Sequence, residues 1–249
     1  MFDANIEKNK IIEFIRNYFD KNNLGGVVIG ISGGKDSGVV AGLFCEAIGP
    51  DKVLGVWMPC KSKDSDYLDA KRVSDKFGFN LITFDLNKTY NSFKDEMELL
   101  GEFTEEEVRN SDINVKPRLR MTTLYYLAAL YSAVNHVTYV VAGTSNKCET
   151  YVGYYTKGGD NVSDINVLGD LCVEEVIKIG EVIGVPEEVL YKSPDDGLSG
   201  ITDEEKLGVK YSDISKVINR EYVGKDTLEK IEDLHKRNLH KLKPVVYER

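Results

Sequence analysis

Hydrophobic positions along the chain follow two different spacings in turn. Residues 6–19 carry apolar side chains at the spacing of an amphipathic helix. Residues 27–31 are a continuous apolar run, which is typical of a parallel strand buried on both faces. A glycine-rich turn separates this run from a second helical pattern over residues 36–48. The chain therefore begins as helix, buried strand, turn and helix.

The same alternation continues through residue 143. Apolar runs predict further strands at residues 53–58, 80–84 and 139–143. Helical spacing predicts a helix at residues 65–77 capped by Ser65, a helical region at 88–110 and a long helix at 117–135. Strands alternating with helices predict an α/β fold, a doubly wound, mostly parallel Rossmann-like sheet with helices on both faces. No repeat or linker divides the chain, so residues 1–249 are expected to form one domain.

Two segments rich in Gly, Asp, Asn and Ser, residues 156–166 and 193–203, resist assignment to a helix or a strand. Loops of this length in a compact domain are usually mobile tips or active-site lids. A plain surface loop is the alternative for both segments.

Composition limits the classes of function. The chain has 249 residues, 42% of them hydrophobic, and a formal net charge of −9, so it lacks the diffuse positive field of a nucleic-acid-binding protein. No signal core and no run of about 18 apolar residues occurs, so neither secretion nor a membrane span is predicted. The four cysteines form no C-x-x-C pair and are expected to be reduced thiols in a cytoplasmic protein.

A six-residue loop, SGGKDS from Ser32 to Ser37, joins the first predicted strand to the following helix. Its glycines let the backbone approach a ligand, and the helix start offers unpaired N–H groups and the positive end of its dipole. Phosphate is the natural guest of such a loop. The carboxylate of Asp36 would repel phosphate unless a Mg²⁺ ion bridged the two. The loop therefore predicts a site for the triphosphate of ATP.

The loop matches neither G-x-x-x-x-G-K-[ST] nor G-x-G-x-x-G. Its pattern SGGxDS resembles the pyrophosphatase loop of ATP-dependent enzymes that adenylate a substrate oxygen and release pyrophosphate. Three later segments read KPRLRMTTLYYLAA, AGTSNKCETYVGYYTKGGDNVSDINVLGDL and LHKRNLHKLKP. Together, and in this order, the four segments resemble the ammonia-dependent NAD synthetases over about residues 6–245.

This resemblance implies conversion of deamido-NAD to NAD. The nicotinate carboxylate would attack the α-phosphorus of ATP and release pyrophosphate, and ammonia would then attack the adenylate and expel AMP. Relatives that use glutamine carry an added amidohydrolase domain, for which this chain has no room, so free ammonia is the expected donor. The family also implies a homodimer with deamido-NAD near the subunit interface.

The resemblance also implies roles for individual residues. For ATP it implies Gly30, Ile31, Ser32, Gly33, Gly34, Lys35, Asp36, Ser37 and Thr144. For Mg²⁺ it implies Asp36 and Glu149, and for deamido-NAD it implies Arg118, Lys157, Asp164, His240 and Lys241. Taken singly, several of these residues have plain alternatives: Arg118, like Arg120, as a solvent-facing charge, Glu149 as a surface acid and His240 as a histidine without function.

Topology provides a physical check on the metal pair. If the strand order is 3-2-1-4, the chain reverses direction beside the first strand, and ligands bind at such a switch point. Glu149 would then face Asp36 across the phosphates. Cys148, next to Glu149, has no activating neighbour in the sequence and is expected only to pack.

Three more positions carry expectations. Asp160 is our candidate base for deprotonating ammonium, and closure of both glycine-rich loops would exclude water from the adenylate, which favours lids over plain loops. Val173 and Asp195 depart from the family pattern, which usually has a lysine and a serine or threonine there. ATP contacts at these two positions are therefore absent or made by the backbone.

Two other functions stay open. A tRNA-modifying enzyme of the same superfamily would need paired cysteines and a basic RNA face. A nucleotide-binding module without turnover would have no need for both Asp36 and Glu149.

Overall fold

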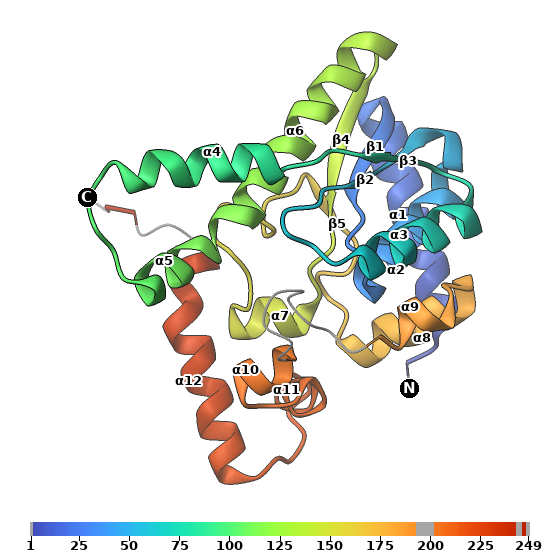
Figure 1. Cartoon of the computed structure of the whole chain (residues 1–249). Helices are drawn as coiled ribbons and strands as arrows, with labels where there is room; N and C mark the ends of the chain where they lie inside the picture. Colours follow the sequence, from blue (N-terminus) through green and yellow to red (C-terminus); the bar gives the residue numbers. More distant parts are fainter. Residues whose placement is uncertain (1, 193–201, 243–245, 248–249) are drawn as a thin grey trace.

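A parallel five-stranded sheet forms the centre of the protein (Figure 1). The computed structural model describes residues 2–192, 202–242 and 246–247. The strands are β1 (Leu24–Gly30), β2 (Val53–Trp57), β3 (Asn80–Thr83), β4 (Thr138–Gly143) and β5 (Ile165–Asn166). They lie in the order β3-β2-β1-β4-β5, and every pair is parallel. The prediction of a doubly wound α/β fold with the order 3-2-1-4 is confirmed, and β5 extends it by one edge strand.

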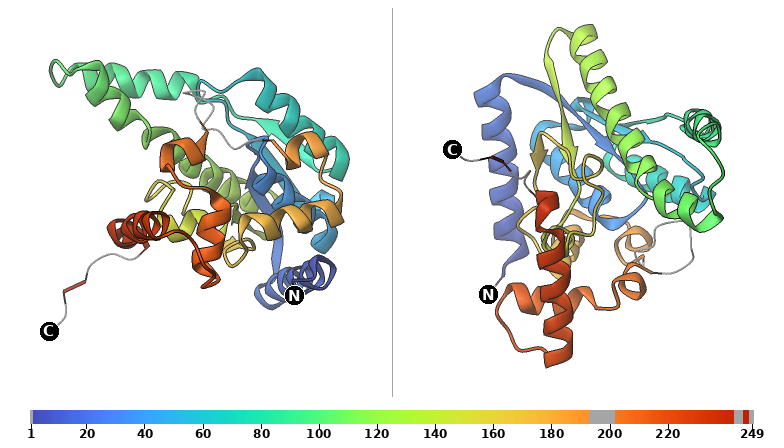
Figure 2. Two further views of the ribbon diagram at one scale, coloured as in Figure 1. Left: turned by 90° about the horizontal axis from the view of Figure 1, so that it is seen from below. Right: turned by 90° about the vertical axis from the view of Figure 1, so that its left-hand side faces the viewer.

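Helices cover both faces of the sheet, which explains the continuous apolar run in β1. In the right-hand view of Figure 2, α1 and α6 lie on opposite sides of the sheet. Val27 and Ile29 point into one hydrophobic cluster and Val28 into another, and all three are fully buried. A strand with two buried faces has no polar positions to alternate with its apolar ones.

The first face is covered by helices from both ends of the chain. They are α1 (Ala4–Asn22), α2 (Lys35–Ile48), α3 (Asp64–Phe77), α8 (Val173–Ile183) and α9 (Glu187–Leu190). A 3-10 turn, η1 (Pro50–Lys52), leads from α2 into β2. Phe44 on α2 and Ile15 on α1 are fully buried in this layer, the first-face cluster.

The second face is covered by α4 (Asn87–Glu98) and the long α6 (Val115–Asn135), with α5 (Glu105–Asp112) between them in sequence. Tyr90 on α4 and Leu127 on α6 are buried against Val28 and Val141. Of the helix predicted at residues 117–135, the C-terminal end is confirmed and the start lies two residues earlier.

A smaller set of helices packs below the sheet in the view of Figure 1. They are α7 (Lys147–Val152), α10 (Asp203–Leu207), α11 (Tyr211–Ile218) and α12 (Lys225–Leu242). With the start of α8 they bury Cys148, Val152, Cys172, Val173, Leu207, Val209, Tyr211, Ile214 and Ile231, which we call the C-terminal cluster.

The structure corrects three local predictions. Residues 88–110 form two helices rather than one helical region, because Gly101 has φ 138° and Thr104 begins a new helix with a capping box to Glu107. Ser65 does not cap α3, whose N-cap position is Lys63. The second unassigned segment ends earlier than predicted, since Thr202 caps α10 and Asp203 is its first residue, while residues 193–201 lie outside the described part.

Within the described ranges, no helix is both long and apolar enough to cross a bilayer.

Candidate active site

The SGGKDS loop makes the turn from β1 into α2, as predicted. Gly33 has φ 82°, and a Cβ atom at this position would lie 2.4 Å from the backbone oxygen of Asp66, so only glycine fits. The hydroxyl of Ser32 lies 3.1 Å from that of Ser37 and accepts a hydrogen bond from the N–H of Gly34. The two serines thus fix the loop's shape and leave the start of α2 facing outward, where an anion is stabilised.

Asp36 and Glu149 are brought together by a third residue, Asn146. Its Nδ2 donates to Oδ1 of Asp36 at 3.2 Å, and its Oδ1 accepts from the backbone N–H of Glu149 at 3.1 Å. Glu149 closes a capping box by accepting from the N–H of Asn146. Asn146 is fully buried and was not predicted as a site residue, although its spacing to Glu149 is a readable capping signal.

The negative charge of Asp36 affects the pKa of the nearby Glu149. Burial, and then the neighbouring charge of Asp36, raise the pKa of Glu149 to about 8. Lys35 is 6% exposed, and its Nζ lies 3.0 Å from Oδ2 of Asp36. Burial alone would lower the pKa of Lys35, but the charges of Asp36 and Glu149 outweigh it and the pKa is raised. The site therefore holds two acids and one buried ammonium group.

These groups line a cavity of about 1640 Å³ at the carboxyl ends of the strands. Such cavities are the usual ligand sites of doubly wound sheets. Of the residues predicted for ATP, metal and catalysis, the cavity is lined by Gly30, Ile31, Ser32, Gly33, Gly34, Lys35, Asp36, Thr144, Glu149 and Asp160. Ser37 is buried behind the loop, where its hydroxyl donates to the carbonyl oxygen of Gly34.

Four of the five residues predicted for deamido-NAD lie outside this cavity lining. Arg118 on α6 donates to the carbonyl oxygen of Lys157 at 3.1 Å, and Nζ of Lys157 donates to the carbonyl oxygen of His240 at 2.8 Å. Asp164 accepts from the N–H of Val141 at 2.8 Å and so holds the approach to β5. The structure thus links Arg118, Lys157 and His240 to one another, outside the cavity that the SGGKDS loop lines. Because this loop is the one predicted to hold phosphate, we call it the phosphate loop below.

Lys241, the fifth of these residues, does line the cavity. Its Nζ donates to the carbonyl oxygens of Gly153 at 2.7 Å and Tyr155 at 3.1 Å. These bonds tie the end of α12 to the segment that follows α7.

Asp160 reaches the cavity from the first glycine-rich loop. Its Oδ1 accepts from the N–H of Thr156 at 2.8 Å. Asp160 is exposed as a whole residue, yet burial of its carboxyl group raises its pKa. A carboxylate that is poorly solvated in this way is a better proton acceptor than a fully exposed one.

Of the two positions that depart from the family pattern, Val173 and Asp195, the structure describes only Val173. Val173 is buried in the C-terminal cluster at the start of α8, where it packs against apolar neighbours. Asp195 lies outside the described residues. Cys148 is fully buried in the C-terminal cluster, with its Sγ 3.3 Å from Oγ of Ser215, and its interaction with Cys172, followed by burial, raises its pKa. This position agrees with the expectation that Cys148 packs.

Comparison with known proteins agrees with this geometry. The NAD synthase family matches residues 7–245. The NH3-dependent NAD+ synthetase of Methanocaldococcus jannaschii is 40% identical over 250 residues, covering 94% of this chain and 92% of that protein. The one from Mesoplasma florum is 38% identical, covering 93% and 91%.

Two solved structures have a similar fold over nearly the whole chain. The NMN synthetase from Francisella tularensis has a TM-score of 0.88 and 30% identity, covering 100% of this chain and 99% of that one. The NH3-dependent NAD synthetase from Campylobacter jejuni has a TM-score of 0.77 and 26% identity, covering 99% and 100%. With the SGGKDS loop facing Glu149 and the family match over nearly its whole length, the chain belongs to the NAD synthase family.

Proposed function

We propose that this protein is an ATP-dependent ligase that amidates deamido-NAD to NAD with ammonia. The observation that carries the proposal is the pairing of the phosphate loop with Glu149 through Asn146 in one cavity. Curated relatives at 34–40% identity are NH3-dependent NAD+ synthetases, which supports both the reaction and the nitrogen donor. We treat residues 1–249 as a single catalytic unit.

In the first step, the nicotinate carboxylate attacks the α-phosphorus of ATP and pyrophosphate leaves. The backbone N–H groups at the start of α2 hold the phosphate oxygens, and the Nζ of Lys35 offsets their negative charge. Ser32 and Ser37 keep the loop in its shape, so its donors do not have to reorganise during the reaction. Catalysis in this step is positioning and electrostatic stabilisation.

Asp36 and Glu149 fit a magnesium ion shared with the phosphates. Within the described ranges, no three acidic, histidine or cysteine side chains gather into a metal site. The charge of Asp36 makes Glu149 harder to ionise, and a bound cation would offset this effect. Two such carboxylates are a suitable partial ligand set, because Mg²⁺ usually takes one or two protein carboxylates and completes its shell with phosphate oxygens and water. When bound, the ion would neutralise charge that develops on the departing pyrophosphate.

In the second step, ammonia attacks the activated carbonyl and AMP leaves. Asp160 is the proposed base that removes a proton from ammonium, since it lines the cavity and its carboxyl is poorly solvated. Asp160→Asn should lower ammonium-dependent turnover, and the defect should shrink as pH rises and supplies more free ammonia. A defect that is independent of pH would show that Asp160 acts otherwise.

The first glycine-rich segment, residues 156–166, was expected to be a lid, but residues 165–166 form β5 in the sheet. We therefore propose that its loop part, residues 156–164, is the lid that excludes water from the adenylate. Lys157 is exposed, so trypsin reports on this segment. Cleavage at Lys157 should slow when ATP and deamido-NAD are bound. An unchanged rate of cleavage would contradict the lid.

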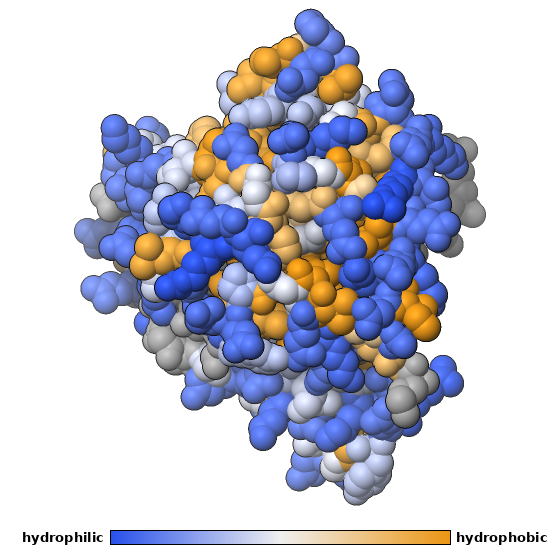
Figure 3. All heavy atoms as spheres, turned by 90° about the vertical axis from the view of Figure 1, so that its right-hand side faces the viewer, coloured by the Kyte–Doolittle hydropathy of each residue, from blue (hydrophilic) through white to orange (hydrophobic). Residues whose placement is uncertain are grey.

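We also propose a homodimer in which α6 contributes to the interface. Tyr126, Leu130 and Val134 are spaced four residues apart on one side of α6 and are all exposed. Figure 3 shows hydrophobic side chains at the upper end of the molecule, where α6 ends and β4 begins. An exposed apolar surface of this kind is typical of a protein–protein contact.

A cytoplasmic location is proposed because all four cysteines are free thiols in the structure. With a net charge of −9, the protein is not expected to bind nucleic acid.

A second candidate is amidation of nicotinate mononucleotide. It is favoured by one observation, the TM-score of 0.88 to the NMN synthetase from Francisella tularensis over the whole of both chains. The nicotinate carboxylate would attack the α-phosphorus of ATP in the same way. Only the molecule that carries this carboxylate would be smaller, a mononucleotide instead of a dinucleotide.

One assay separates these possibilities. The protein is incubated with ATP, Mg²⁺ and ammonium and with either deamido-NAD or nicotinate mononucleotide, and AMP, pyrophosphate and amidated product are followed. Formation of NAD confirms the first proposal, and formation of only the mononucleotide amide selects the second. Pyrophosphate release that depends on neither acceptor would favour a different adenylating enzyme, and no release from folded protein would favour a nucleotide-binding module without turnover.

A further inference from the structure

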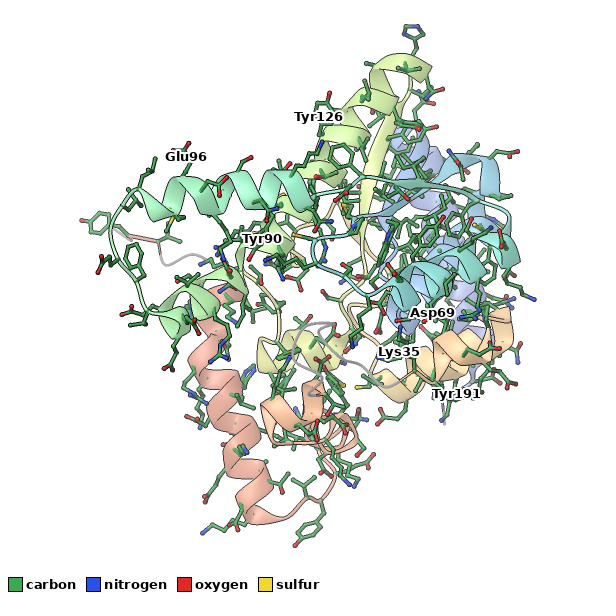
Figure 4. All side chains as sticks on the ribbon, in the orientation of Figure 1. Lys35, Asp69, Tyr90, Glu96, Tyr126 and Tyr191 are labelled. Carbon is green, nitrogen blue, oxygen red and sulfur yellow. The ribbon has the colours of Figure 1, made fainter. Side chains whose placement is uncertain are left out.

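A group of basic side chains lines the cavity where β2 ends and α6 begins. Lys61 follows β2, and Lys116 and Arg120 lie one turn apart at the start of α6. All three line the same cavity as Lys35. Figure 4 labels Tyr90, beside which the lysines lie, and Lys35, and shows them on different sides of the central opening of this view.

Lys116 is the central member of this group. Its side chain is 6% exposed, and its Nζ lies 5.4 Å from the centre of the Tyr90 ring. Within the described part of the chain, no carboxylate forms an ion pair with this ammonium group and no hydrogen bond to it is made. A buried lysine without an ionic partner is costly unless something else stabilises its charge.

The neighbouring cations add to this cost. The Nζ of Lys61 lies 5.1 Å from the centre of the same Tyr90 ring. Among the described residues, Arg120 donates to the carbonyl oxygen of Met58 at 3.3 Å and to Oγ of Ser62 at 3.4 Å, both of them neutral and long bonds. The charges of Asp160 and Asp66 also act on Arg120, but neither forms an ion pair with it within the described part of the chain. Burial, and then the charges of Arg120 and Lys61, lower the pKa of Lys116.

The nearby acid is already engaged. Asp112 accepts a hydrogen bond from the hydroxyl of Tyr90 and lies 3.6 Å from Nζ of Lys94. Lys94 is therefore compensated, whereas Lys116, at which burial and the charges of Arg120 and Lys61 outweigh the charge of Asp112, keeps an uncompensated positive charge in the cavity wall.

We propose that Lys61, Lys116 and Arg120 form an oxyanion-binding subsite that takes a phosphate or carboxylate group of a nucleotide bound in this cavity. A lysine and an arginine together offer charge-assisted hydrogen bonds in the arrangement that such anions require. The Tyr90 ring lies close enough to both ammonium groups to stabilise their charge by cation–π attraction.

The position of the subsite favours the acceptor over ATP as the source of the oxyanion. The triphosphate has its own donors at the start of α2 and at Lys35, on the other wall. The acceptor must reach the α-phosphorus from across the cavity, and this brings its anionic group toward α6. This assignment rests on the proposed function for the identity of the nucleotides, but the subsite itself does not.

The test uses Lys116→Met, which keeps the apolar stem against Tyr90, and Lys116→Arg, which keeps the charge. Lys94→Met is the matched control, because it removes a lysine beside the same ring whose charge Asp112 already compensates. Dissociation constants are measured by calorimetry for deamido-NAD, nicotinate mononucleotide and a non-hydrolysable ATP analogue. Thermal unfolding of each free protein is measured in parallel. Neither measurement needs turnover, so a failure of the subsite and a failure of the proposed function give different results.

Lys116→Met is expected to weaken binding of the acceptor by about 10- to 100-fold, the usual loss for one hydrogen bond to a charged group, with little change for the ATP analogue. The same variant should unfold at a higher temperature than the wild type, since an uncompensated buried charge has gone. Lys116→Arg should bind within a few fold of the wild type, and Lys94→Met should do the same.

A loss confined to the ATP analogue would support the subsite and assign its oxyanion to ATP. Unchanged affinity for all three nucleotides in Lys116→Met would overturn the proposal. A lower unfolding temperature combined with unchanged affinity would identify Lys116 as a structural residue.

Discussion

The ammonium group of Lys35 lies 3.0 Å from Oδ2 of Asp36, its neighbour in sequence. The two side chains are 7% and 17% exposed, so the pair is held in a poorly solvated part of the site. Glu149, whose charge also acts on Lys35, adds a second acid to the same region. The lysine within the SGGKDS loop is thus an internal counter-ion for the proposed metal ligands.

Removing this counter-ion should destabilise the free protein. We expect Lys35→Met to lose on the order of 3 kcal/mol of unfolding free energy, because it leaves the largely buried carboxylate of Asp36 without its ionic partner, with only the hydrogen bond from Asn146 remaining among the contacts of the described residues. Added Mg²⁺ should raise the unfolding temperature of Lys35→Met more than that of the wild type. The control is Lys71→Met, which removes an exposed lysine paired with Asp75 and should leave unfolding unchanged. Equal responses to Mg²⁺ in Lys35→Met and the wild type would contradict this role.

The two glycines of the phosphate loop should differ sharply in their tolerance of alanine. Gly33→Ala forces a Cβ to 2.4 Å from the backbone oxygen of Asp66 at φ 82°, and should cost on the order of 1–3 kcal/mol and abolish ATP binding. Gly34→Ala is the matched control, since the nearest atom to its Cβ is the hydroxyl oxygen of Ser32 at 3.3 Å. It should lose at most about 1 kcal/mol as a poorer N-cap. Urea unfolding and ATP titration measure both effects, and equal losses would refute the argument.

Asn146 should matter more for catalysis than for substrate binding. Asn146→Ala removes the N-cap of α7, at a cost of about 1 kcal/mol, and the hydrogen bond that holds Asp36 toward Glu149. We expect kcat to fall by at least tenfold while KM for ATP changes much less. Thr202→Ala supplies a control, because it removes an equivalent capping-box residue from α10 without a bond to Asp36. If both variants lost kcat equally, the effect would be one of stability alone.

Asp160 should make the stability of the free protein depend on pH. Its folded-state pKa is raised, so folding disfavours the ionised form. The cost is absent below the unfolded-state pKa of about 3.9 and grows as pH rises above it. Asp160→Asn removes this cost and keeps an oxygen acceptor for the N–H of Thr156. The variant should therefore unfold at a higher temperature than the wild type near pH 7 and at the same temperature near pH 3.5. A constant difference across that range would show that ionisation is not the cause.

The exposed side of α6 should control the oligomeric state. Tyr126→Lys places a charge within the apolar surface that also includes Leu130 and Val134, and should convert a dimer to a monomer in sedimentation experiments. Tyr222→Lys is the control, because Tyr222 is 91% exposed between α11 and α12, away from this surface. A monomeric wild type, or loss of the dimer in both variants, would contradict the proposed interface.

Sequence patterns predicted the sheet well because its central strands, β1 and β2, are buried on both faces. Apolar runs such as residues 27–31 have few other structural solutions, and the strand order then placed Glu149 opposite Asp36. The break between α4 and α5 was missed even though Gly101 and the capping pair of Thr104 and Glu107 are visible in the sequence.

The cationic side of the cavity was beyond sequence reasoning. Arg120 had a plain alternative as a solvent-facing charge and Lys116 carried no prediction, and only the packing of α6 on the sheet determines that both line the cavity. The residues expected for deamido-NAD show the reverse: most of them were predicted for the site but lie outside the cavity lining. Arg118 and Lys157 were assigned through family resemblance, and the structure places them outside the cavity lining, joined to each other. Their role stays a prediction that the ligand-binding assays can test.

The bond between Asn146 and Asp36 joins two separately packed parts of the protein. Asp36 belongs to α2 in the first-face cluster, whereas Glu149 belongs to α7 in the C-terminal cluster. A ligand bound to both carboxylates would connect the two clusters. Part of its binding free energy would therefore stabilise the packing of the C-terminal cluster against the rest of the protein. Amide hydrogen exchange in α7, α11 and α12 should then slow on nucleotide binding far more than exchange in the sheet.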